Sequence, residues 1–92
     1  MPFKTFEGIT IFYMKPSHLP FHFDIAYQIK LMMATDEPFT FVPDGKPDYT
    51  FTIKFNSGKR FKITTRRVDL SDKFFKNIVS KIDPLPDATD SS

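Results

Sequence analysis

The sequence contains no cysteine, which excludes disulfide bonds and any metal site built on thiolate ligands. It has only three glycines, too few for a glycine-rich phosphate-binding loop. No apolar run approaches the roughly 18 residues of a membrane-spanning helix, and the N-terminus lacks the apolar segment of a signal peptide. We therefore expect a cytoplasmic protein with no membrane span.

The residues that are present are typical of a small globular domain. Of the 92 residues, 40% are hydrophobic and 26% are charged, a composition too apolar for a disordered chain. Twelve phenylalanines supply large side chains for a core. We predict one globular domain over residues 1–82. Residues 83–92 carry little apolar surface, which predicts a flexible acidic tail.

The clearest local pattern is a β-hairpin. Apolar and polar residues alternate from 49 to 55 and again from 61 to 65, separated by a short loop that contains Gly58. Glycine is expected there because the turn requires a positive φ angle. A three-residue loop at 56–58 places Lys54 opposite Arg60 on the outer face of the hairpin.

The segment after this hairpin has a helical period. Ser71 is a suitable N-cap, and Leu70 and Phe75 are spaced as a hydrophobic staple. One stripe of a helix over 71–82 collects the apolar side chains Phe74, Phe75, Ile78, Val79 and Ile82. The Asp83-Pro84 pair then ends the predicted helix.

The segment 21–33 fits two structures. Every odd position in it is apolar, which favours a strand, and Pro16 and Pro20 before it predict a turn that no long helix crosses. The alternative is a helix over 24–35 capped by Asp24, since alanine, glutamine, lysine, leucine and methionine favour helix. We predict a strand for the first part of the segment.

Shorter strands are predicted at 9–14 and 39–41, and a turn at 43–47. The fold class is then α+β, a bent antiparallel sheet of about four to six strands packed by one C-terminal amphipathic helix. A hairpin followed by a helix over 49–82 resembles the end of a pleckstrin-homology-like domain; a roll is the alternative form of the sheet. The resemblance implies no ligand and no residue roles. If 24–35 is helical, the order becomes β-α-β-β-β-α.

The candidate binding residues are basic side chains of the hairpin. Six Lys or Arg residues and no acid lie between Asp48 and Asp69: Lys54, Lys59, Arg60, Lys62, Arg66 and Arg67. Such a strip is expected of a surface that binds an acidic protein or a phosphate-bearing partner. It is equally typical of a solvated strand face, where charge prevents edge-to-edge pairing.

No catalytic or metal site is predicted. His18 and His22 have the i, i+4 spacing of zinc ligands on a helix, but Pro20 between them is expected to break that helix. No cysteine is available as a nucleophile and no G-x-S-x-G motif is present. We therefore expect no enzyme activity, no cofactor and no bound metal.

The sequence favours a non-catalytic protein-interaction module, such as a small regulatory or inhibitory protein. It would bind another protein, an acidic one in particular, through the basic hairpin 49–67 or through an exposed sheet edge, which also suits a homodimer. The alternative is a nucleic-acid-binding domain that uses the strip at 54–67. Single-strand binders usually expose aromatic side chains beside their basic groups. Here Phe51, Phe55 and Phe61 fall on the opposite, core-facing side of the hairpin.

Overall fold

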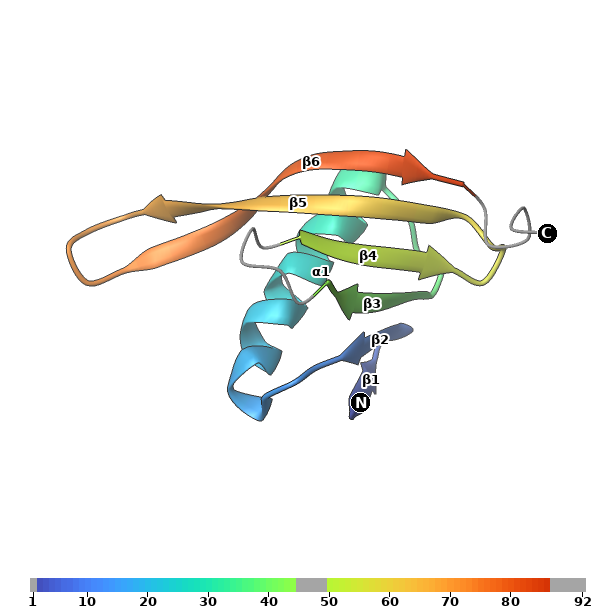
Figure 1. Cartoon of the computed structure of the whole chain (residues 1–92), viewed down its shortest axis with the longest axis horizontal. Coiled ribbons are helices and arrows are strands. Elements are labelled where there is room, and N and C mark those ends of the chain that lie inside the picture. Colours follow the sequence, from blue (N-terminus) through green and yellow to red (C-terminus); the bar gives the residue numbers. More distant parts are fainter. Residues whose placement is uncertain (1, 45–49, 87–92) are drawn as a thin grey trace.

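The computed structural model of the chain describes residues 2–44 and 50–86. They form one six-stranded sheet, in the order β1 to β6, with one α-helix across one face (Figure 1). Neighbouring strands are antiparallel except β2 and β3, which are parallel and joined through the helix. The elements are β1 Phe3–Phe6, β2 Ile9–Phe12, a 3₁₀ turn Pro16–His18, α1 Leu19–Met33, β3 Phe39–Pro43, β4 Thr50–Phe55, β5 Arg60–Asp69 and β6 Phe75–Leu85.

The α+β class and the mostly antiparallel sheet are confirmed, but the C-terminal position of the helix is wrong. The only α-helix in the described residues is α1, which occupies the segment predicted as a strand. Its buried side chains recur at the spacing of one helix face: His22, Ile25, Ala26 and Ile29. Pro20 lies in the first helical turn, where its missing N–H has no intrahelical partner to lose, so it does not break the helix.

The predicted helix over 71–82 is instead a turn and most of β6. A long β5 needs a hydrogen-bonding partner on its free edge, and the β-branched Ile78, Val79 and Ile82 suit that strand. A bulge between Thr64 and Thr65 leaves Ser80 unpaired, which disguises the period-two pattern. The resemblance to the end of a pleckstrin-homology-like domain is therefore wrong. The β-α-β-β-β-α alternative places the first helix correctly and its last helix wrongly.

The hairpin prediction is confirmed in detail. Lys54 pairs with Arg60 and Ile53 with Phe61, as a loop at 56–58 requires. Gly58 has a φ angle of +99°, and its N–H donates to the Phe55 carbonyl oxygen. The predicted strands at 9–14 and 39–41 are present as β2 and β3. Most of the predicted turn at 43–47 and residues 87–92 of the predicted tail lie outside the described residues, while residues 83–85 belong to β6.

The core lies between α1 and the face of the sheet that the helix covers. Its fully buried side chains come from the helix and from the central strands: Ile9, Ile11, Ile25, Ile29, Phe41, Ile53 and Ile63. Phe41 stacks on Phe51 with ring centroids 4.7 Å apart. Aromatic rings therefore fill much of the space between helix and sheet.

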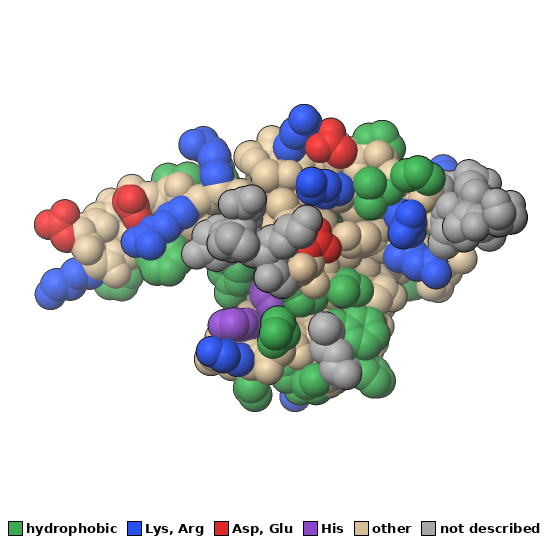
Figure 2. Space-filling model, viewed as in Figure 1, with side chains coloured by type: hydrophobic (Ala, Val, Ile, Leu, Met, Phe, Trp, Pro, Cys, Tyr) green, Lys and Arg blue, Asp and Glu red, His purple; other side chains and the backbone are tan. Residues whose placement is uncertain are grey.

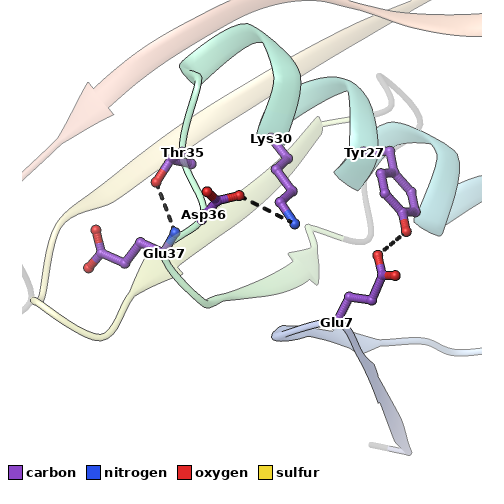
Figure 3. Close-up of polar contacts among 6 residues, drawn as sticks. All are labelled: Glu7, Tyr27, Lys30, Thr35, Asp36 and Glu37. Atoms are coloured by element: carbon purple, nitrogen blue, oxygen red, sulfur yellow. Dashed lines mark hydrogen bonds and ion pairs between the residues drawn. The ribbon is translucent and has the colours of Figure 1, made fainter.

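Polar contacts link the middle of α1 to the β1–β2 turn and the end of α1 to the segment that follows it (Figure 3). The Tyr27 hydroxyl donates a hydrogen bond to the Glu7 carboxylate in the β1–β2 turn, and this bond raises the pKa of the tyrosine. After the helix, Lys30 approaches Asp36 at 3.9 Å and the Glu37 N–H donates to the Thr35 hydroxyl. The Tyr27–Glu7 bond links α1 to the first hairpin, whereas the other two contacts lie within the crossover. The described residues contain no helix both long enough and apolar enough to span a membrane.

Candidate functional site

The structure divides the predicted basic residues between two faces and a turn. Lys54, Arg60, Lys62 and Arg66 alternate with residues that face α1, so they share the uncovered face of the sheet. Lys59 lies in the β4–β5 turn. Arg67 falls on the other face, where its guanidinium stacks 4.0 Å from the ring centroid of Phe75.

Acidic side chains that are distant in sequence interrupt the basic face. Asp83 of β6 lies opposite Lys62 and approaches Lys81 at 3.7 Å. Asp44 accepts a hydrogen bond from Thr52 on the neighbouring strand. Figure 2 accordingly shows basic side chains spread among acidic and neutral ones rather than gathered in one patch. The six predicted residues do not form a single continuous site.

A second feature is the distal part of the β5–β6 hairpin, residues 66–78, which we call the arm. It extends past α1 and the other strands along the long axis of the molecule (Figure 1). Its turn is held by mutual hydrogen bonds: the Leu70 and Ser71 N–H groups donate to the Phe74 carbonyl, and the Phe74 N–H donates to that of Ser71. The arm exposes three large apolar side chains, Leu70, Phe74 and Phe75.

A cleft of about 390 Å³ lies at the root of the arm. The start of α1 forms one wall with Phe21 and His22, and the ends of β3 and β4 contribute Pro43 and Phe51. Residues from the arm, from the segment before α1 and from the start of β4 complete the lining: Phe75, Asn77, Met14, Ser17, His18 and Thr50. The walls are mostly aromatic and aliphatic.

Two buried polar side chains in this cleft each have one atom without a hydrogen-bond partner among the described residues. His22 is 5% exposed and Asn77 is 4% exposed, and no described residue forms a hydrogen bond with His22 Nδ1 or Asn77 Oδ1. A buried polar atom without a partner costs about 1–3 kcal/mol and is uncommon in folded proteins. Burial, helped by the neighbouring His18, lowers the pKa of His22 to about 4, so its imidazole is neutral at pH 7.

The two histidines do come together at the start of α1, contrary to the expected break at Pro20: His18 ends the 3₁₀ turn and His22 lies in the helix. Their ring centroids lie 5.8 Å apart. Within the described residues, however, no group of three or more histidine and carboxylate side chains is placed to hold a metal ion. Ser17 lines the same cleft, but a histidine with a pKa near 4 is a weak base toward a serine hydroxyl.

Comparison with models of known protein families, with curated proteins and with solved structures gave no match in any of the three. No family is shown. The function is therefore inferred from the residues of this chain.

Gln28 of α1 holds the edge strand β6 beside the cleft. Its side-chain amide N–H donates to the backbone carbonyl oxygen of Asn77 at 3.1 Å, and its side-chain oxygen accepts from the backbone N–H of Val79 at 3.0 Å. The two bonds fix the backbone on both sides of Ile78. They also satisfy polar groups on the strand's unpaired edge.

Replacing Gln28 with methionine is expected to lower the free energy of unfolding by about 1–3 kcal/mol, because the Val79 N–H is left without its partner. Urea denaturation followed by circular dichroism measures the change. Tyr27→Phe is the control, since it removes an exposed hydrogen bond from the adjacent residue and should change stability by less than about 0.5 kcal/mol. Equal effects of the two substitutions would contradict the role given to Gln28.

The cleft could not be predicted from the sequence. His22 is recognised as a core position only when 22, 25, 26 and 29 are aligned on a helix. Asn77 shares a strand face with Val79 only when the segment is treated as a strand. Neither alignment is visible while residues 21–33 are treated as a strand and residues 71–82 as a helix.

Proposed function

We propose that this chain is a non-catalytic protein-interaction module whose docking element is the arm. The observation that carries the proposal is the exposure of Leu70, Phe74 and Phe75, which are 67%, 69% and 52% exposed on a segment that projects from the body. Large apolar side chains grouped on a projecting element are typical of contact surfaces for another protein.

The arm is suited to binding because its turn is already ordered. The hydrogen bonds between Ser71 and Phe74 close it, and Arg67 bridges the two strands through Phe75 while also pairing with Asp69 at 2.9 Å. A preordered element loses less conformational entropy on binding than a flexible loop. A two-stranded ribbon with no layer packed on it gains stability when a partner covers it.

The charges of the arm favour a partner with an apolar groove and an acidic rim. Four cations flank the exposed apolar residues, Arg66, Arg67, Lys73 and Lys76, against the two acids Asp69 and Asp72. Asp69 is already paired with Arg67. The cations of the sheet face, Lys54 and Lys62 among them, would add longer-range attraction to the same partner.

The proposal is tested by quantitative capture from lysate with the intact protein and two matched double variants. Leu70→Ser/Phe74→Ser removes apolar surface from the arm. Leu31→Ser/Met32→Ser removes similarly exposed apolar surface from the end of α1. We expect a partner that is kept by the wild type and the α1 variant, resists nuclease, and falls at least about tenfold with the arm variant.

Other outcomes overturn the proposal. Capture that nuclease abolishes, and that Lys54→Glu/Lys62→Glu weakens, would instead indicate nucleic-acid binding through the sheet face. Self-association detected by light scattering and lost in the arm variant would make the occupant a second copy of this chain. Equal capture by all variants would remove the arm as the docking element.

A further inference from the structure

We propose that the cleft at the root of the arm is a binding site for a small, uncharged aromatic compound that carries a hydroxyl or N–H group. No partner of the arm is needed for this site, so the inference stands apart from the proposed docking function. It rests on the shape and lining of the cleft and on two buried polar atoms without partners.

The size and lining of the cleft fit a compound of one or two rings. Ligand pockets in proteins typically enclose about 300–1,000 Å³ and are lined by apolar and aromatic side chains with a few polar groups. This cleft measures about 390 Å³, and Phe21, Phe51 and Phe75 present rings to it from the helix, the sheet and the arm. Met14 adds a flexible thioether that adapts to an aromatic ring.

The polar atoms define what the ligand must offer. Asn77 Oδ1 accepts hydrogen bonds, and a neutral imidazole nitrogen such as His22 Nδ1 accepts or donates according to its tautomer. A hydroxyl group both donates and accepts, so it satisfies either tautomer of His22 as well as Asn77. A purely apolar ligand would leave both atoms unpaired and would bind less well.

The charges argue for a neutral ligand. None of the described lining residues is Asp, Glu, Lys or Arg, so the described walls offer no carboxylate, ammonium or guanidinium to a charged ligand. Burying an unpaired charge there would be strongly unfavourable. His22 itself is neutral at pH 7 because burial lowers its pKa.

The test compares phenol with toluene, which has the same size but no hydroxyl group, by ¹⁵N–¹H NMR titration of the intact protein at pH 7. We expect phenol to bind with a dissociation constant on the order of 1 mM, as befits a ligand of so few atoms. Toluene should bind about tenfold more weakly, because it leaves the buried polar atoms unpaired. The shifted amides should belong to Phe21, Phe75 and their neighbours, and the His22 imidazole nitrogens should shift with phenol alone.

Variants separate the polar contacts from apolar filling. Asn77→Leu and His22→Leu should each reduce the preference for phenol over toluene. Ile78→Leu, on the opposite face of β6 from Asn77, should leave that preference unchanged. If either cleft variant fails to fold, the wild-type comparison and the His22 imidazole shift still decide the question. Equal affinity for the two compounds, or shifts scattered over exposed residues such as Phe3, would overturn the proposal.

Discussion

Replacing Phe41 with alanine is expected to lower the free energy of unfolding by about 3–5 kcal/mol, the usual result of emptying a large aromatic site in a core. Phe41 is fully buried at the centre of the sheet. Its ring stacks on Phe51 at 4.7 Å and lies 5.7 Å from the His22 ring, so the cavity would open between helix and sheet. Urea denaturation followed by circular dichroism measures the loss.

The control for this prediction is Phe74→Ala. Phe74 lies in the turn of the arm and is 69% exposed, so its truncation should change the stability of the isolated protein by less than about 0.5 kcal/mol. The two substitutions remove the same atoms, which makes burial the variable. Similar losses for both would mean that the phenylalanines of the arm pack on the body in solution.

Much of the sheet could be predicted from the sequence because its signals are local. The register of β4 with β5 follows from alternation, loop length and one glycine, and each lies within a few residues of the others. The side of the sheet that Phe61 faces was also predicted. The depth of its burial was not, because Phe61 lies near an end of β5 and is only partly buried, against Phe55 at 5.9 Å.

The helix could not be chosen over a strand because both periods fit residues 21–33. Alternation places Phe21, Phe23 and Ile25 on one side, whereas the helix buries Ile25, Ala26 and Ile29 together. The parallel pairing of β2 with β3 decides between them, since parallel neighbours need a crossover connection and α1 supplies it. That pairing joins residues 9–11 to residues 39–41 and is visible only in the folded structure.

The same limit applies to residues 71–82 and to the candidate site. The apolar stripe there fits a helix until the bulge at Ser80 and the free edge of β5 are known. Asp83 is brought opposite Lys62 by this strand, which interrupts a strip that is uniformly basic along the sequence. The cleft depends on α1, the sheet and the arm meeting at one place, and no single segment signals that.

Acid should destabilise the protein through His22, by up to about 3 kcal/mol between pH 6.5 and pH 4, at 1.36 kcal/mol for each unit of pKa difference. Burial, with a contribution from His18, lowers the pKa of His22 from its ordinary 6.5 to about 4. Between these values the unfolded chain binds the proton and the folded one does not. The free energy of unfolding is therefore fully retained above pH 6.5, falls as the pH drops toward 4, and loses nothing more from this group below that.

The measurement is urea denaturation at a series of pH values for the wild type and for His22→Leu. Carboxylates titrate in both proteins, so the difference between the two curves isolates the histidine. We expect the wild type to lose more stability than the variant over this interval, with the difference flat above pH 7. Parallel curves would mean that folding leaves the pKa of His22 unchanged, and the predicted loss of stability in acid would then be wrong.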